Sequence, residues 1–369
     1  MVYYQVCVMS PDDLIKTIAP AALAFFIGMS ITPIVTHYLY KYKCWKKTSG
    51  KKVGYAGGGT PLFDELHKER EVSTPRMGGI VIWASVILTI AVLWLMDRYV
   101  GGAIWEKLEF LSRSQTWLPV FALLIGAVVG FVDDLMEIRG NGKHFAGGLP
   151  LSKRLLVVGA VSVFAGWWFY EKLEVSGVSV PFNGIVDLGP WFILFFAVVG
   201  LAIYAGGVID GIDGLAGGVF AIMFASYGII ALVQGQMDLA AFCGTVVGGL
   251  LAFLWFNIPP ARFYMSETGV MGLTLALTIV AFMTDAIVGG KGVAVLPLIA
   301  LPLVLTVGSD LIQVASKRLR GGKKVFRIAP VHHHFEAIGW PSYKVTMRYW
   351  VFSMIAAFLG VLLALVGAL

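Results

Sequence analysis

Ten stretches of about 20 mostly apolar residues recur along this sequence, and that is the length an α-helix needs to cross the hydrocarbon core of a membrane. The chain has 369 residues, of which 58% are hydrophobic and 14% charged, and its mean hydropathy of +0.82 lies outside the range of soluble domains. We therefore predict an all-α polytopic membrane protein with about ten transmembrane helices. The predicted spans lie near residues 14–40, 77–96, 117–136, 154–171, 190–208, 214–233, 239–257, 269–288, 293–315 and 348–367.

No charged or Pro/Ser-rich linker separates these windows and no fixed-period repeat is present, so we expect one integral-membrane domain spanning residues 1–369. The first window is longer than a signal-peptide core and lacks a clear small-residue cleavage site, which favours a retained span. The three cysteines are far apart in sequence and predict neither a disulfide framework nor a cysteine metal site.

The distribution of Lys and Arg predicts the orientation. If the spans alternate, the connections at 41–76, 137–153, 209–213, 258–268 and 316–347 share one side. Together with their edges they hold most of the 28 Lys and Arg residues, and the exceptions are Lys16, Arg98, Lys107, Arg113, Lys172 and Lys291. The positive-inside rule places these connections in the cytoplasm and both termini in the periplasm. The net charge of +6 is then a property of cytoplasmic loops, and we expect no nucleic-acid partner.

Acidic residues stand at the ends of several apolar windows: Asp133 and Asp134, Asp210 and Asp213 in Asp-Gly-Ile-Asp-Gly, and Glu267 in Met-Ser-Glu-Thr-Gly. A carboxylate costs about 2.5–3.5 kcal/mol at the centre of a spanning helix, so such residues need a reason beyond folding. They were not used to set the orientation, yet all fall on the predicted cytoplasmic side. This convergence predicts one active site at the cytoplasmic face.

Each motif has a functional and a simpler interpretation. Adjacent helical residues point about 100° apart, so one of Asp133 and Asp134 can meet a ligand while the protein holds the other; alternatively, both are solvated at a helix end. The glycines of residues 210–214 allow close backbone approach, and the amides of the following helix can bind phosphate, but a plain tight turn explains them equally well.

The later cytoplasmic loops carry amide, aromatic and imidazole groups. Asn257, Tyr264 and Glu267 suit recognition of a nucleobase and its metal-bound phosphates. The triple His332-His333-His334 lacks the spacing of a zinc site, and a proton carrier or hydrogen-bond donor beside phosphate fits it better. Together these groups indicate Mg²⁺-dependent phosphoryl transfer from a soluble nucleotide to a lipid. A transporter is the alternative of a different class, although transporter sites usually lie near the bilayer midplane.

Beyond these separate motifs, the sequence resembles the phospho-N-acetylmuramoyl-pentapeptide transferases, within the superfamily of polyprenyl-phosphate N-acetylhexosamine-1-phosphate transferases. The resemblance spans nearly the whole chain. Its most specific part is the block Arg327-Ile328-Ala329-Pro330-Val331-His332-His333-His334-Phe335-Glu336, and the other motifs are Thr74 to Gly79, Gly130 to Asp134, Asp210 to Ala216 and Met265 to Gly269.

This resemblance implies a ten-helix protein of the bacterial inner membrane, usually a homodimer, with both termini outside. It implies Mg²⁺-dependent transfer of phospho-MurNAc-pentapeptide from UDP-MurNAc-pentapeptide to undecaprenyl phosphate, which gives lipid I and UMP for peptidoglycan synthesis. A polyprenyl-phosphate N-acetylglucosamine-1-phosphate transferase is the alternative within the superfamily.

The resemblance also implies roles for individual residues. Asp133 and Asp134 would handle the acceptor phosphate, with one of them as a candidate general base, and His332 would be the catalytic histidine. Glu267 stands where the family has the Asp that binds Mg²⁺. The expected substrate contacts are Lys153 at the pyrophosphate, Asp210, Asp213, Asn257 and Tyr264 around the nucleoside, and Thr74, Gly211, His333 and His334 elsewhere in the site.

The sequence departs from the family pattern at five positions. Glu267 replaces Asp, and its extra methylene is expected to move the metal or the supporting backbone by about an ångström. Ser266 replaces Gly, Tyr204 and Gly207 stand where the family has Asn, and Glu71 stands where it has Lys. These departures bear on donor specificity more than on the reaction class.

Overall fold

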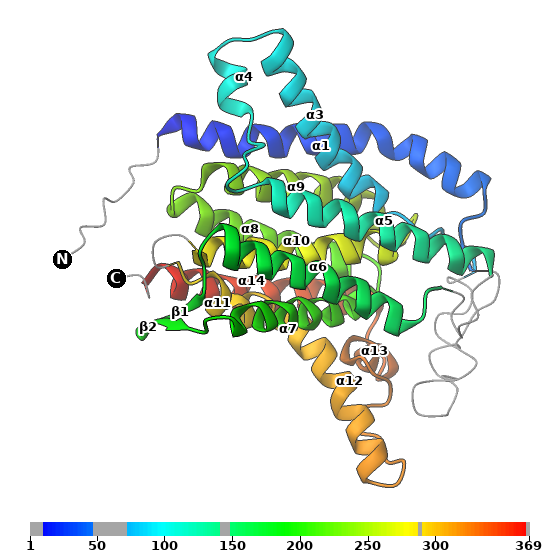
Figure 1. Cartoon of the computed structure of the whole chain (residues 1–369). Coiled ribbons are helices and arrows are strands. Elements are labelled where there is room, and N and C mark those ends of the chain that lie inside the picture. Colours follow the sequence, from blue (N-terminus) through cyan, green and yellow to red (C-terminus); the bar gives the residue numbers. More distant parts are fainter. Residues whose placement is uncertain (1–9, 47–71, 141–147, 287–289, 367–369) are drawn as a thin grey trace.

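The computed structural model describes residues 10–46, 72–140, 148–286 and 290–366, and Glu71 lies outside them. The described residues form a bundle in which most of the long helices run side by side (Figure 1). In chain order the elements are α1 (Pro11–Lys41), α3 (Ile80–Tyr99), α4 (Ala103–Leu108), α5 (Trp117–Arg139), α6 (Leu151–Lys172), β1 (Gly177–Val180), β2 (Gly184–Asp187), α7 (Trp191–Gly206), the 3₁₀ helix η1 (Gly207–Ile209), α8 (Leu215–Val233), α9 (Met237–Asn257), α10 (Ser266–Ala286), α11 (Gly292–Ile299), α12 (Leu301–Leu319), α13 (Val331–Ala337) and α14 (Ser342–Val366).

Among the described residues, nine helices are long and apolar enough to cross a membrane, and the pair α11 and α12 makes a tenth if it counts as one span. This confirms the prediction of a multi-pass membrane protein. The pair is bent by 64°, whereas residues 293–315 form a single apolar window in the sequence. Pro302 lies in the first turn of α12 and has no N–H to continue the hydrogen bonding of α11. Hydropathy does not register such a change of direction.

Helix α10 lies at the centre of the bundle. In its most apolar 18-residue window 94% of the residues are buried, against 22% in α1, which faces outward. Helices α5 and α10 touch through their backbones where they cross. Gly130 makes this possible, because a Cβ at that position would overlap the backbone of Glu267. Small residues allow such close approach between membrane helices. The crossing brings the end of α5, with its two aspartates, against the first turn of α10.

A short hairpin corrects the all-α prediction in detail. Strands β1 and β2 pair antiparallel, with Gly177 opposite Asp187 and Val180 opposite Gly184. Gly184 adopts a φ of 76°, which a glycine tolerates without a steric penalty, and so allows the chain to turn back. The hairpin lies outside the apolar windows, at the same end of the bundle as the start of α1 and the end of α14 (Figure 1).

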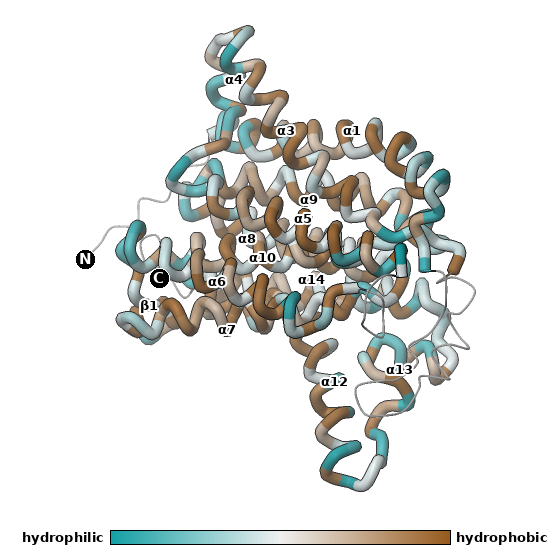
Figure 2. The backbone as a smooth tube through the Cα atoms, turned by 45° about the vertical axis from the view of Figure 1, so that its right-hand side comes forward, coloured by the Kyte–Doolittle hydropathy of each residue, from teal (hydrophilic) through white to brown (hydrophobic). Residues whose placement is uncertain are grey.

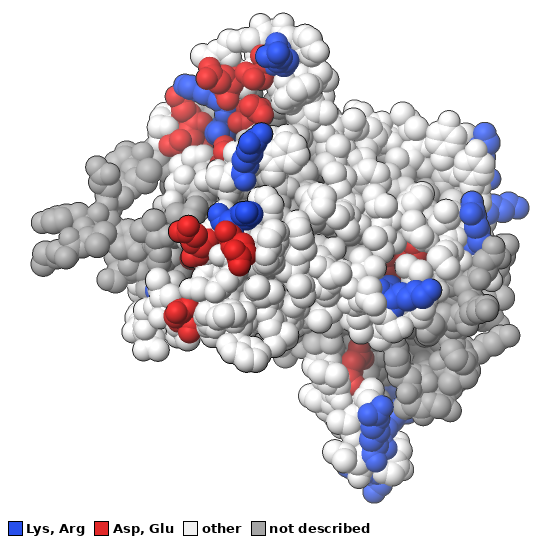
Figure 3. All heavy atoms as spheres, viewed as in Figure 1, with Lys and Arg blue, Asp and Glu red and all other residues white. Residues whose placement is uncertain are grey.

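Polar residues gather at the two ends of the bundle and the helix midsections are apolar (Figure 2). On the face shown in Figure 3, charged side chains likewise cluster at the ends and leave a largely uncharged band between them. One end carries the hairpin, the start of α1 and the end of α14. At the opposite end, called the motif end below, α5 finishes and α8 and α10 begin.

Candidate active site

Asp133 and Asp134 lie in the last two turns of α5, and both side chains are buried. They point to different partners, as expected for neighbours on a helix. A carboxylate oxygen of Asp133 accepts a hydrogen bond from the backbone N–H of Leu149. Asp134 Oδ2 accepts from the backbone N–H of Thr268 at 2.9 Å and from its hydroxyl at 2.6 Å. Asp134 Oδ1 is also buried and has no hydrogen-bond partner among the described residues.

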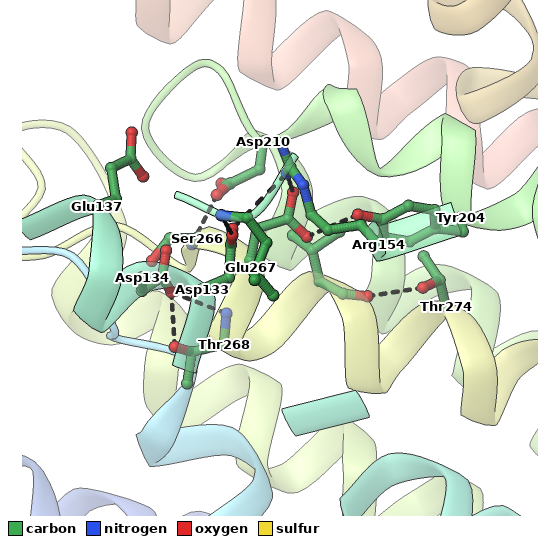
Figure 4. Close-up of polar contacts among 12 residues, drawn as sticks. Asp133, Asp134, Glu137, Arg154, Tyr204, Asp210, Ser266, Glu267, Thr268 and Thr274 are labelled. Atoms are coloured by element: carbon green, nitrogen blue, oxygen red, sulfur yellow. Dashed lines mark hydrogen bonds and ion pairs between the residues drawn. The ribbon is translucent and has the colours of Figure 1, made fainter. Parts of the chain in front are cut away.

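Glu267 lies in the first turn of α10 and contacts side chains from two other helices (Figure 4). Its Oε1 is 2.5 Å from a guanidinium nitrogen of Arg154 on α6. Its Oε2 accepts a hydrogen bond from the Tyr204 hydroxyl on α7 at 3.3 Å. The same Arg154 nitrogen is 3.7 Å from Asp133 Oδ2. One guanidinium therefore joins the carboxylates of α5 and α10.

The structure accounts for three of the departures from the family pattern. Ser266 has a φ of 51°, a conformation that favours glycine, but its hydroxyl accepts a hydrogen bond from the Met77 N–H at 2.8 Å. Tyr204 supplies the second contact to the longer Glu267 side chain. Gly207 begins η1, and a Cβ there would come within 2.4 Å of Val270 Cγ1, so the packing leaves no room for an Asn side chain.

The loop at 210–214 joins this cluster through Asp210. Its Oδ2 accepts a hydrogen bond from the Ser266 N–H at 2.8 Å, which places the loop beside the start of α10. Burial raises the pKa of Asp210 to about 6, and the Ser266 N–H lowers it in part. This carboxyl can therefore change its charge closer to neutral pH than an ordinary aspartate.

The histidines of α13 approach the same loop. A Cβ on Gly211 would come within 2.7 Å of Nε2 of both His332 and His333, so only glycine allows this approach. Both rings are buried, with centroids 4.3 Å apart, and His333 Nδ1 lies 2.8 Å from Glu336 Oε2. His334 points elsewhere, because its Nδ1 accepts from the backbone N–H of Arg327 at 3.1 Å.

Two predicted nucleoside contacts also hold the loops in place. Asn257 Oδ1 accepts from the Gly214 N–H at 2.9 Å, and its Nδ2 donates to the Phe263 carbonyl at 2.8 Å. Asp213 Oδ2 accepts from the Ala261 N–H at 3.1 Å. Both side chains are buried. They join the loop at 210–214 to the loop after α9.

Tyr264 and Thr74 come from two segments that pair through their backbones. The Tyr264 N–H donates to the Pro75 carbonyl at 2.8 Å, and the Tyr264 carbonyl accepts from Gly78 at the same distance. Thr74 is half-buried beside this pairing. These contacts hold the Thr-Pro-Arg motif against the loop that leads into Glu267.

Sequence reasoning selected Lys153 and missed its neighbour Arg154. The Lys153 side chain is exposed in the first turn of α6, whereas Arg154 is partly buried and turns toward Glu267. Glu137 was missed as well, although it lies one turn after Asp133 and Asp134 on α5. It forms ion pairs with Arg76 and with Lys46, the latter at 3.2 Å. Glu137 follows the two aspartates by about one helical turn, and this spacing alone could have predicted that it lies on the same side of α5.

The carboxylates provide hard oxygen ligands of the kind that Mg²⁺ prefers. Within the described ranges, no group of three or more His, Cys, Asp and Glu side chains is arranged to hold a metal. Mg²⁺ is commonly held by one or two carboxylates together with substrate phosphates and water, so a complete protein cage is not needed. Glu267 and Asp133 fit that requirement, because their carboxylates converge on one place. An oxygen of each lies near the same Arg154 nitrogen, at 2.5 Å for Glu267 and 3.7 Å for Asp133.

Comparison with known proteins supplies the family. Residues 116–285 match the model of Glycosyl transferase family 4. Over 358 residues the chain is 30% identical to a phospho-N-acetylmuramoyl-pentapeptide-transferase of Listeria monocytogenes, covering 95% of this chain and 98% of the relative. The chain belongs to this transferase family. Relatives of the same name from Chloroflexus aggregans and Thermodesulfovibrio yellowstonii are 31% and 34% identical, covering 96% and 81% of this chain and 91% and 81% of their own lengths.

The family membership confirms the resemblance found from the motifs and does not favour the N-acetylglucosamine alternative. The matched family model includes the α5 aspartates, Arg154, the loop at 210–214 and Glu267. The histidine block lies beyond its end. Within this transferase family, the contacts described above are the framework on which a reaction can be assigned.

Proposed function

We propose that this chain transfers phospho-MurNAc-pentapeptide from UDP-MurNAc-pentapeptide to undecaprenyl phosphate, forming lipid I and releasing UMP for peptidoglycan synthesis. The observation that carries the proposal is the match, over nearly the whole chain, to transferases of that name. The contacts at the motif end support it, because they gather carboxylates, a guanidinium and imidazoles from five parts of the sequence.

In the proposed reaction, an oxygen of the lipid phosphate forms a bond to the phosphorus next to the sugar, and the bond from that phosphorus to UMP breaks. Asp133 and Asp134 position the acceptor phosphate, and one of them takes its proton. Arg154 supplies positive charge beside them, which offsets negative charge on the phosphates. The buried pair His332 and His333, beside Gly211, provides hydrogen-bond donors for the donor substrate.

Glu267, with Asp133 beside it, would hold Mg²⁺, which when bound would neutralise charge on the bridging phosphates. Tyr204 and Arg154 orient the Glu267 carboxylate from opposite oxygens. Asp210, Asp213, Asn257 and Tyr264 form the nucleoside side of the site. Thr74 and Lys153 complete the proposed substrate contacts.

The positive-inside bias favours a cytoplasmic motif end and periplasmic termini in the bacterial inner membrane. That orientation presents the site to a soluble UDP-linked donor while the lipid acceptor arrives from the membrane. The chain acts as one domain over residues 1–369 and as a homodimer.

The deciding experiment is release of UMP by purified protein supplied with Mg²⁺, UDP-MurNAc-pentapeptide and undecaprenyl phosphate. We expect release with this donor and little with UDP-N-acetylglucosamine. The opposite preference would replace the proposal with the N-acetylglucosamine alternative. In the same assay, Glu267→Gln is expected to raise the Mg²⁺ concentration needed for half-maximal rate, and an unchanged titration would remove Glu267 from the metal site.

A further inference from the structure

A cleft of about 480 Å³ opens at the motif end, between the last turns of α1 and the loop that follows α9. Pro33 and Phe256 form its apolar part, and Tyr40 lies beside them. His37, Lys41 and Arg262 form its basic part. None of these residues belongs to the carboxylate cluster on α5 and α10.

The charge of the cleft favours an anion. Lys41 and Arg262 are exposed, and neither forms an ion pair with another residue that the structure describes. Arg262 lies over the Phe256 ring at 5.6 Å, and Lys41 lies 5.9 Å from the Tyr38 and Tyr42 rings. These aromatic contacts hold the two cations in place without neutralising them. A phosphate group matches such a pair of hydrogen-bond donors.

The surroundings of the cleft favour a phosphate that carries acyl chains. Tyr38, Tyr40 and Tyr42 with Lys41 form the aromatic and basic band that marks the headgroup level of a membrane. Further along the same helix, Phe26 and Ile34 are 65% and 59% exposed. A lipid with its phosphate in the cleft can therefore lay its chains along the apolar surface of α1, which a free phosphate cannot do.

The cleft also connects to the loop that carries site residues. The Tyr40 hydroxyl donates a hydrogen bond to the Arg262 carbonyl at 3.0 Å, which fastens α1 to this loop. The buried ring of Phe263 packs between Phe253 and Phe256, with centroids 5.7 and 6.3 Å away. Tyr264 and Glu267 follow within a few residues. A ligand bound by Arg262 would therefore stabilise the loop that leads into α10.

We infer that this cleft binds the headgroup of an anionic diacyl phospholipid from the surrounding leaflet. The lipid phosphate accepts hydrogen bonds from Arg262 and Lys41, with His37 beside them, and the acyl chains lie against α1. This site is separate from the site for the polyprenyl acceptor and does not depend on the proposed reaction.

The test is native mass spectrometry of the delipidated full chain with phosphatidylglycerol or phosphatidylethanolamine added back. We expect tighter retention of phosphatidylglycerol by the wild type, and a loss of about 30-fold in the Lys41→Gln/Arg262→Gln double variant, since each basic residue near an anionic lipid is worth roughly fivefold. Arg318→Gln, an exposed basic residue of α12 outside the cleft, is the matched control and should retain the lipid.

Several results would overturn the inference. Equal retention of the two phospholipids by the wild type would do so without reference to any variant. Unchanged phosphatidylglycerol binding by the double variant would move the lipid elsewhere. Displacement by millimolar inorganic phosphate would indicate a free-anion site, and displacement by undecaprenyl phosphate at equimolar concentration would assign the cleft to the acceptor.

Discussion

The two ends of α10 each carry a buried or partly buried carboxylate, but different kinds of partner hold them. At the hairpin end, Asp285 accepts hydrogen bonds from the backbone N–H groups of Ser179 and Val293 at 3.0 and 3.3 Å. At the motif end, Glu267 contacts the side chains of Arg154 and Tyr204. Asp134, beside it, keeps one buried oxygen without a partner among the described residues.

The difference separates Asp285, which backbone groups hold, from Glu267, whose partners are side chains. Backbone donors are fixed by the fold, so Asp285 joins β1, α10 and α11 and has little freedom to take another partner. Side-chain donors such as Arg154 can turn toward a substrate without unfolding a helix. A buried carboxylate oxygen with no partner costs stability, and such a cost is typical of functional sites.

The largest effect is expected for the α5 aspartates. Asp133→Asn and Asp134→Asn should each reduce the rate of UMP release by about 100- to 10,000-fold, because a neutral amide cannot accept a proton. The fold should survive in the Asp134 variant. Its amide oxygen can keep both Thr268 hydrogen bonds while the NH₂ takes the position of the unpartnered Oδ1. Near-normal turnover in both variants would remove these residues from the chemistry.

A smaller loss is expected at the guanidinium. Arg154→Met should lower UMP release by about 100-fold, since it removes the positive charge shared by Asp133 and Glu267. Lys153→Met, at the exposed neighbouring position, removes one proposed pyrophosphate contact but no contact to the carboxylates, so it should cost less, about tenfold. Equal losses in the two variants would mean that charge at the start of α6, and not the Arg154 contacts, is what matters.

At the opposite end of α10, we expect a change in stability without a change in chemistry. Asp285→Asn replaces one carboxylate oxygen by an NH₂ group that faces a backbone N–H, which should cost about 1–3 kcal/mol. Thermal unfolding in detergent should therefore occur at a lower temperature. Turnover per folded molecule should match wild type, and a loss of turnover comparable to that of the α5 variants would refute the contrast between the two ends.

The sequence predicted the two ends of α10 unequally. Apolar windows and basic loops placed Asp133, Asp134 and Glu267 on one side of the membrane, since both signals are local. They left Asp285 unmarked, because the partners that define its role lie on β1 and α11. They also could not decide between Lys153 and Arg154, since the choice depends on the rotation of α6 against α10. The bend between α11 and α12 was not predicted for a similar reason, because the hydropathy of a segment does not depend on the direction in which its helix runs.

Asp210 gives the smallest predicted effect. It lies at the motif end and, like Asp133 and Asp134, accepts a hydrogen bond from a backbone N–H, that of Ser266. Burial raises its pKa to about 6 from an ordinary value of 3.8. Between about pH 4 and 6 the folded protein therefore keeps a proton that the unfolded chain has lost, so stability should fall as the pH rises through this window.

The measurement is the difference in melting temperature between wild type and Asp210→Asn, taken from pH 4 to pH 7 in EDTA. The variant lacks this titration, so the melting temperature of the wild type should fall relative to it by about 2 °C across the window and stay level above pH 6. A constant difference would mean that Asp210 titrates as an ordinary surface carboxyl. A rise would mean that the folded protein stabilises the ionised form of Asp210.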